Sequence, residues 1–196
     1  LAEGGEEAMD EAIWTRQGRL QFGIELKVVD DDGKDLAWDG QSSGALLARG
    51  PWTIKRYFRM EKDAAQADGW FDTGDIATID QHGFMRITDR KKDVIKSGGE
   101  WISSIDLESA AAGCPGVKIA AVIGVPHPKW EERPILIVER HEGSKVTDAE
   151  IQDYLAPRIV KWWKPDAIIF DAVPLTATGK IDKKTLRARY GEALSG

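Results

Sequence analysis

A change of hydrophobic pattern at the charged cluster Asp89-Arg-Lys-Lys-Asp93 limits the folds open to this chain. Before the cluster, short alternating apolar runs are separated by turns rich in Asp and Gly, which is typical of antiparallel hairpins. After it, segments of helical periodicity alternate with apolar runs of strand length. With 196 residues the chain is long enough for two small domains, so we expect two structural units with a boundary at this cluster.

The region before the cluster is predicted to be mostly β. Its first ten residues are acidic, small and aperiodic, and we expect residues 1–15 to be poorly ordered. Gly83 can supply the positive φ that the second hairpin turn requires. The expected strands are 22–29, 45–49, 76–79 and 84–88, with turns at 30–33 and 80–83.

The region after the cluster is predicted to mix helices and strands. Ser103 or Ser104 can cap a helix that ends near residue 112, before Gly113 and Pro115. Thr147-Asp-Ala-Glu150 is a capping box that opens a second helix. Ile151, Tyr154, Leu155 and Ile159 share one face of this helix, which Pro157 should kink or end early. Strands are expected at 118–125, 135–140 and 167–170 and a last helix at 182–190, so the fold class is α+β.

Composition excludes several classes of protein. The chain has no apolar run near the roughly 20 residues that span a bilayer. Its net charge of −6 argues against nucleic-acid binding, so we expect small-molecule or protein partners. A single Cys114 and the scattered His82, His127 and His141 offer no disulfide framework and no metal-ligand spacing. The expected compartment is the cytoplasm, and the lack of an initiator Met indicates a piece of a longer protein.

Two clusters near the boundary could carry chemistry. In Gly69-Trp-Phe-Asp-Thr-Gly-Asp75 a Gly-bounded turn presents Asp75, which can accept both hydroxyls of a ribose or simply cap the turn. Arg90 could reach the same sugar or its phosphate, with Lys91, Lys92 and Lys96 adding positive charge, although a run of charges is usually a solvated face.

Two further clusters lie in the second region. The paired glycines of Ser97-Gly-Gly-Glu-Trp101 either let the backbone pass close to another group or form a plain tight turn, and both readings stay open. The loop Pro174-Leu-Thr-Ala-Thr-Gly-Lys180 presents a lysine that can bring a compact charge to a phosphate or oxyanion, or can be an ordinary surface lysine. This loop lacks the spacing of a Walker phosphate loop.

Taken in order, these four clusters resemble the adenylate-forming enzymes, which include acyl-CoA synthetases, luciferases and the adenylation domains of peptide synthetases. The resemblance runs from about residue 16 to residue 190. Gly99-Glu-Trp-Ile-Ser-Ser-Ile-Asp-Leu-Glu108 and Lys161-Trp-Trp-Lys-Pro-Asp166 look most like medium- and long-chain fatty-acyl-CoA synthetases. The resemblance implies that residues 1–89 are the β-rich end of a large adenylation domain and residues 90–196 a small mobile C-terminal domain.

The family implies two half-reactions: a carboxylate attacks the α-phosphate of ATP to give acyl-adenylate and pyrophosphate, and the thiol of CoA then displaces AMP. Asp75 matches the ribose-binding aspartate and Arg90 the arginine that helps to hold ribose. Lys92 falls at the hinge about which the small domain rotates. Lys180 matches the lysine that bridges carboxylate and phosphate oxygens during adenylation.

The CoA site is implied in the same way. Gly98, Gly99 and Glu100 match the loop that lines the pantetheine path, and Trp101 is expected to wall it. The cofactors implied are ATP or AMP, CoA and Mg²⁺, bound mainly through an N-terminal region absent from this sequence. The partners implied are a fatty acid or other carboxylate, CoA and the rest of the parent chain, so this piece alone should not complete the reaction.

Residue 131 departs from the pattern, since the family usually has Gly where this chain has Glu131. Alternative functions also remain at this point. The parent could adenylate another acid, such as an aryl or sulfur-containing one, or transfer it to a carrier-protein thiol. The chain could also be a non-catalytic binding or regulatory piece.

Overall fold

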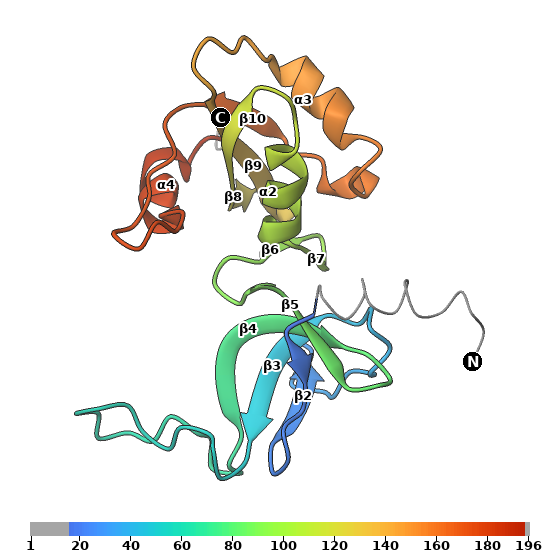
Figure 1. Ribbon diagram of the computed structural model, residues 1–196, viewed down its shortest axis with the longest axis vertical. Coiled ribbons are helices and arrows are strands. Elements are labelled where there is room, and N and C mark those ends of the chain that lie inside the picture. Colours follow the sequence, from blue (N-terminus) through green and yellow to red (C-terminus); the bar gives the residue numbers. More distant parts are fainter. Residues whose placement is uncertain (1–15, 195–196) are drawn as a thin grey trace. The chain divides into compact units, whose positions relative to one another are not determined.

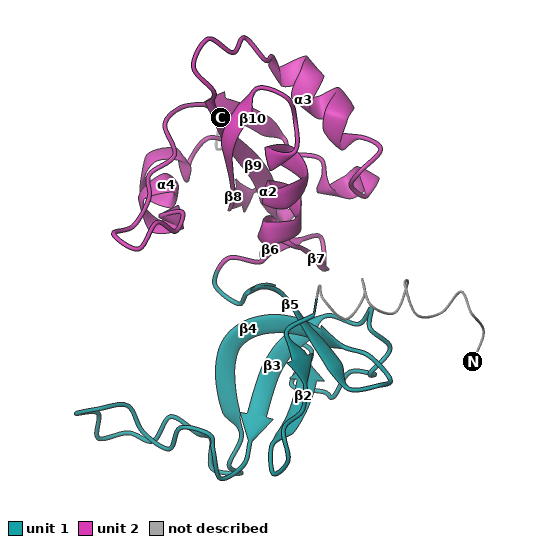
Figure 2. Cartoon of the chain, in the orientation of Figure 1, with its two compact units in different colours: residues 1–92 teal, residues 93–196 magenta. Residues whose placement is uncertain are grey.

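The computed structural model describes residues 16–194 and divides the chain into two compact units, Leu1–Lys92 and Asp93–Gly196 (Figure 2). The expected disorder of residues 1–15 lies outside the described residues. The expected boundary followed residue 89, whereas this division follows Lys92. The difference arises because the last strand of the first unit continues to Arg90, and the N–H of Lys91 then bonds the carbonyl of Gly74 at 2.9 Å.

The first unit is an antiparallel five-stranded sheet in the order β1-β5-β4-β3-β2 (Figure 1). Its turns form as predicted: the carboxylate of Asp80 accepts the N–H groups of His82 and Phe84, and Gly83 has φ of 79°. Buried Val28, Leu46, Ala77 and Ile79 form its core. The strands are β1 (Gly18–Arg19), β2 (Glu25–Val29), β3 (Gly44–Arg49), β4 (Phe71–Ile79) and β5 (Phe84–Arg90).

Two predicted strands of this unit have different limits. The strand expected from residue 22 begins at Glu25, because Gly23 has φ of 82° in a turn and the side chain of Phe22 is fully exposed. The strand expected from residue 76 begins at Phe71, and its extra residues pair with β3. The second difference matters for function, since it places the whole Phe71–Asp75 segment in the sheet.

The second unit is built around β9 (Glu131–Arg140), which pairs antiparallel with β8 (Val117–His127), parallel with β10 (Ala167–Phe170) and at one position with β6. Its elements are β6 (Ile95–Ser97), β7 (Glu100–Ile102), α2 (Ser104–Ala112), β8, β9, α3 (Asp148–Leu155), the 3₁₀ turn η1 (Lys161–Trp163), β10 and α4 (Lys183–Tyr190). The α+β class predicted from the sequence is confirmed.

Both faces of the β8–β9 pair are buried, which explains why these strands read as continuous apolar runs. Val122 and Leu136 face the core beneath α2 and α3, whereas Ile123 and Ile135 face a second core that contains Leu186 of α4. Figure 1 shows α2 and α4 on opposite sides of these strands. Each fully buried aliphatic side chain of this kind contributes about 1.5–3 kcal/mol to folding.

The predicted helix caps are confirmed. The hydroxyl of Ser103 accepts the N–H of Asp106 at the start of α2, and Thr147 and Glu150 form both halves of the capping box at α3. Helix α3 ends at Leu155, two residues before Pro157, so Ile159 lies beyond the helix, although it still packs against the same core. Among residues 16–194 no helix combines the length and hydrophobicity needed to cross a membrane.

Candidate functional site

Asp75 and Arg90 lie directly opposite each other on β4 and β5. The Arg90 Nε is 3.0 Å from the Asp75 Oδ1, but the geometry is that of an ion pair, and Oδ1 is buried without a hydrogen-bond partner among the described residues. The Asp75 side chain is 16% exposed and that of Arg90 is 55% exposed. The pair therefore presents a carboxylate with one oxygen that accepts no hydrogen bond from the described residues, next to a reachable guanidinium.

The turn-like start of β4 holds Asp75 in place. Gly74 has φ of 75°, a left-handed conformation that a side chain disfavours, and its N–H bonds the carboxylate of Asp72. The hydroxyl of Thr73 accepts the N–H of Asp75 and donates to the carbonyl of Leu46. These bonds engage the Asp75 N–H within β4, whereas its carboxylate faces Arg90.

Lys91 makes a second ion pair beside the first, with its Nζ 2.7 Å from the Asp72 Oδ2. Burial acts to raise the pKa of Asp72, but the hydrogen bonds from Lys91 and from the Gly74 N–H outweigh it, so the pKa is lowered. Gly74, Arg90, Lys91 and Lys92 line a surface hollow. The positive charge expected around Asp75 is thus present on three consecutive residues.

The ring of Trp70, at the start of the same motif, contacts two cations. The Nζ of Lys27 lies 4.8 Å and the Arg49 guanidinium 4.6 Å from the ring centroid. Arg49 in turn pairs with both carboxylate oxygens of Glu25. These contacts fix the end of the sheet from which β4 leads to Asp75.

The segment from Ser97 to Trp101 is a tight hairpin turn. Gly98 and Gly99 have φ of 63° and 85°, and Ser97 pairs with Glu100 across the turn. No atom lies within 4 Å of the position that a Cβ would take on Gly99, so its backbone borders open space. Trp101 lies half-buried opposite Lys96, whose Nζ is 5.5 Å from the indole centroid. The glycines therefore form the tight turn, which was one of the two interpretations of the sequence. The backbone at Gly99 also remains open to a close approach by another group, as the other interpretation requires.

Trp130 packs against this turn from the loop before β9. A Cβ on Gly98 would lie 2.8 Å from the Trp130 ring, and the N–H of Gly98 bonds the Trp130 carbonyl at 2.9 Å. The next residue, Glu131, has φ of 69°. The position where the family usually has Gly therefore has a backbone conformation that favours glycine.

Lys180 lies in a closed loop on the approach to α4. The Thr176 N–H bonds the Lys180 carbonyl at 2.7 Å, and Gly179 closes the turn with φ of 78°. The Lys180 side chain is exposed. It lies on neither the hairpin that carries Gly98 nor the sheet that carries Asp75.

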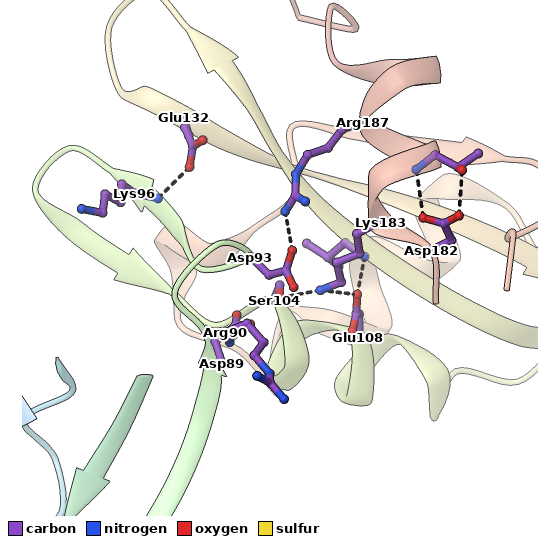
Figure 3. Close-up of polar contacts among 12 residues, drawn as sticks. Asp89, Arg90, Asp93, Lys96, Ser104, Glu108, Glu132, Asp182, Lys183 and Arg187 are labelled. Carbon is purple, nitrogen blue, oxygen red and sulfur yellow. Dashed lines mark hydrogen bonds and ion pairs between the residues drawn. The ribbon is translucent and has the colours of Figure 1, made fainter. Parts of the chain in front are cut away.

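Helix α4 is fastened to its unit by ion pairs (Figure 3). Lys183 donates to the hydroxyl of Ser104 and lies 2.9 Å from Glu108 of α2, and Arg187 pairs with Asp93 at 2.7 Å. Asp182 caps the helix through the N–H and the hydroxyl of Thr185. The loop that presents Lys180 thus leads into a firmly held helix.

Sequence patterns did not single out three residues whose side chains support these sites. Asp72 gave no signal apart from its place in the motif, and Trp130 and Arg133 gave none, since both precede the apolar strand expected at residues 135–140. The part of the chain that the structure describes contains no group of three or more His, Cys, Asp or Glu residues arranged to hold a metal ion.

Comparisons with known proteins bear on this arrangement. Residues 106–180 match the family model of the AMP-binding enzyme C-terminal domain. The chain is 52% identical over 181 residues to 3-methylmercaptopropionyl-CoA ligase of Ruegeria lacuscaerulensis, covering 92% of this chain and 34% of that protein. It is 49% identical to medium-chain-fatty-acid–CoA ligase of Ectopseudomonas oleovorans, covering 99% of this chain and 36% of that protein. The chain therefore spans about a third of the length of these relatives.

Solved structures of similar enzymes share the fold of this chain. ATP-bound MatB from Rhodopseudomonas palustris aligns with a TM-score of 0.79 and 32% identity, covering 92% of this chain and 36% of that one. The o-succinylbenzoate CoA synthetase MenE from Bacillus subtilis, in complex with its acyl-adenylate OSB-AMP, aligns with a TM-score of 0.79 and 30% identity, covering 93% and 37%. From the matched domain, the similar acyl-CoA ligases and the shared fold, the chain belongs to the adenylate-forming, AMP-binding enzyme family and contains its C-terminal domain.

Proposed function

We propose that this chain is the C-terminal part of an AMP-forming acyl-CoA ligase that activates an unbranched fatty acid. One observation supports the nucleotide half of this proposal most directly: the Asp75 carboxylate has a buried oxygen without a hydrogen-bond partner among residues 16–194, next to an accessible Arg90. A carboxylate has two acceptor oxygens, which suit the two hydroxyls of a ribose, and the exposed guanidinium can bond the same sugar.

In this proposal Lys180 serves the first half-reaction. A carboxylate oxygen of the acid attacks the α-phosphorus of ATP, and the bond to pyrophosphate breaks. The exposed ammonium of Lys180 neutralises charge on the carboxylate and phosphate oxygens as this happens. Lys92, the last residue of the first unit, is the proposed hinge between the half-reactions, and the division of the chain after this residue supports that role.

The Gly98–Gly99 turn serves the second half-reaction. The thiol of CoA, losing its proton, attacks the acyl carbon, and the bond to AMP breaks. The open backbone at Gly99, exposed Glu100 and half-buried Trp101 are proposed to line the path of the pantetheine arm. Mg²⁺ is proposed to be held mainly by residues outside this chain. The proposed compartment is the cytoplasm, because the single Cys114 is a buried free thiol.

A second candidate substrate is a short thioether acid, because the relative with 52% identity is a 3-methylmercaptopropionyl-CoA ligase. Such an acid and a fatty acid both have an unbranched apolar tail behind the carboxylate. This chain supplies residues that are proposed to contact the nucleotide and CoA. The choice between the two acids therefore depends on the remaining part of the protein.

The proposal is tested on the full-length protein that contains this chain. ATP–pyrophosphate exchange is measured with straight-chain fatty acids of increasing length, with 3-methylmercaptopropionate and with benzoate, followed by acyl-CoA formation after CoA is added. We expect exchange that depends on the acid, and acyl-CoA formation, with a fatty acid. If the strongest exchange occurs with 3-methylmercaptopropionate, the second candidate substrate is supported. If the adenylate forms but CoA accepts no acyl group, while a carrier-protein thiol does, the acceptor is a carrier protein and not CoA. If no acid supports exchange, the proposed ligase activity is rejected.

A further inference from the structure

Arg133, near the start of β9, uses every donor of its guanidinium. Its Nε and Nη2 bond the Asp166 Oδ1 at 2.9 and 2.7 Å, and Nη2 also bonds the Lys164 carbonyl at 2.9 Å. Its Nη1 bonds the Ser97 hydroxyl at 3.1 Å and the Trp162 carbonyl at 3.0 Å. Only 12% of the side chain is exposed. A largely buried and fully bonded guanidinium fixes the relative positions of its partners.

These partners lie in two segments far apart in sequence. Ser97 ends β6 and immediately precedes the Gly98–Gly99 turn, whereas Trp162 and Lys164 lie in and just after η1. Arg133 therefore connects the glycine turn with the η1 segment. The glycine turn is the part of this unit that the proposed function assigns to CoA.

The residues around Arg133 hold the same turn. The Trp130 carbonyl accepts the Gly98 N–H, and the Glu132 carboxylate accepts the Lys96 N–H at 3.0 Å (Figure 3). Together with the bond from Arg133 to the Ser97 hydroxyl, residues 130–133 contact each of the three consecutive residues 96–98. We call residues 130–133 the β9 clamp.

The hairpin needs such support because it is short. β6 and β7 have three residues each, and β6 pairs with β9 only where Ser97 meets Glu131. A two-stranded hairpin of this length is marginally stable by itself. Ile95 and Ile102 anchor its base in the core, and the bonds of the clamp hold the glycine turn at its tip.

We propose that Arg133 is a positioning residue for the thioester half-reaction, acting by holding the glycine turn and the η1 segment in one arrangement. Arg133 bonds protein groups only, so its effect on the reaction passes through the turn. The inference rests on the proposed function, in which that turn lines the CoA path. A displacement of about 1 Å at such a site can cost roughly a hundred-fold in rate.

The test compares the full-length wild-type protein with Arg133→Lys. Lysine keeps the charge but has three donors on a compact ammonium, so it cannot reproduce the planar fork. We expect ATP–pyrophosphate exchange within about two-fold of wild type, and thioester formation from supplied acyl-adenylate reduced about ten- to a hundred-fold, with a higher KM for CoA. Ser97→Ala removes one partner only and should produce a smaller loss in the same half-reaction.

Arg140→Lys is the matched control, because Arg140 lies at the other end of β9. Its Nε bonds the Val146 carbonyl, and its guanidinium stacks on the Phe170 ring at 3.5 Å from the centroid. Hence it is also a structural arginine, but it does not hold the glycine turn. We expect no separation of the two half-reactions in this variant, whatever its change in Tm.

Amide hydrogen exchange provides a readout independent of activity. Exchange at residues 96–98 and 161–164 should be faster in Arg133→Lys and unchanged in Arg140→Lys. Equal loss of both half-reactions at unchanged Tm, or a wild-type rate of thioester formation, overturns the role of Arg133. If Arg133→Lys does not fold, Ser97→Ala decides by the same two readouts. If the wild-type protein forms no adenylate, the proposed function is rejected instead. Faster amide hydrogen exchange at both segments in Arg133→Lys would then support only the structural role of the β9 clamp.

Discussion

Asp75 on β4 faces Arg90 on β5 across a single cross-strand position, and the Arg90 Nε lies 3.0 Å from a buried oxygen of Asp75. The register of the hairpin produces this pairing. A β-bulge follows at once, between the Ile76 and Ala77 pairings, so it does not displace the pair. The two residues are separated by fourteen others in the sequence but lie side by side in the sheet.

Asp75→Asn in the full-length protein should weaken ATP binding. The variant keeps the shape but loses the charge, and a hydrogen bond to a charged group contributes about 1.5–3 kcal/mol. We therefore expect KM for ATP to rise about ten- to a hundred-fold, since each 1.4 kcal/mol is about a factor of ten. Asp32→Asn, in an exposed turn of the same unit, is the control. An unchanged KM for ATP in Asp75→Asn would contradict the ribose-binding role.

Lys180→Ala should abolish adenylation and spare the second half-reaction. Removing a preorganised charge costs about a hundred- to a thousand-fold in rate, and Lys180 is proposed to contact the reacting carboxylate and phosphate oxygens only in the first step. Pyrophosphate exchange and thioester formation from supplied acyl-adenylate measure the two steps separately. Lys184→Ala changes an exposed lysine of α4 and should leave both rates intact. Equal losses in both steps for Lys180→Ala would refute this division of roles.

Lys92→Pro should damage thioester formation more than adenylation. Proline holds φ near −65° and also restricts the preceding residue, so it stiffens the point at which the two compact units divide. Lys92→Ala removes the same side chain but leaves the backbone free, and it should be nearly normal in both steps. Similar losses in the two variants would show that the side chain matters and the hinge does not.

Glu131→Gly should stabilise the protein. The φ of 69° at Glu131 is costly for a residue with a side chain and accessible to glycine, and the expected gain is about 1 kcal/mol after the larger chain entropy of glycine is included. Tm should rise by about 4–8 °C for a unit of this size. Glu142→Gly, an exposed position of the same unit without a positive φ, should lower Tm. A lower Tm in Glu131→Gly would mean that the Glu131 side chain contributes more than its backbone costs.

The Asp72–Lys91 pair should make stability depend on pH in the acid range. Because the folded protein lowers the pKa of Asp72 below its ordinary value of 3.8, the pair stabilises the fold above that value. This contribution disappears as pH falls through the lowered pKa. Denaturant unfolding of wild type and Asp72→Asn at several pH values should show a deficit for the variant at neutral pH that vanishes in strong acid. A deficit that persists in strong acid would assign the effect to packing.

Local chemistry in the sequence was sufficient to locate most of the helices, strands and turns. Ser103, Thr147 and Asp182 cap helices through bonds that span three residues, so their neighbours in sequence are their partners in space. The turns at Asp80–Gly83 and Gly98–Gly99 form for the same local reason. The order of the four motifs likewise identified the family from the sequence alone.

Contacts between segments far apart in the chain could not be predicted from the sequence. The lengths of β4 and β5 follow from their pairing with other strands, which is why the first unit extends to Lys92. Arg133 becomes a link between two segments only when the fold brings Ser97, Trp162 and Asp166 around its guanidinium. Periodicity and caps record interactions over a few residues, whereas strand register and buried ion pairs depend on how the whole chain packs.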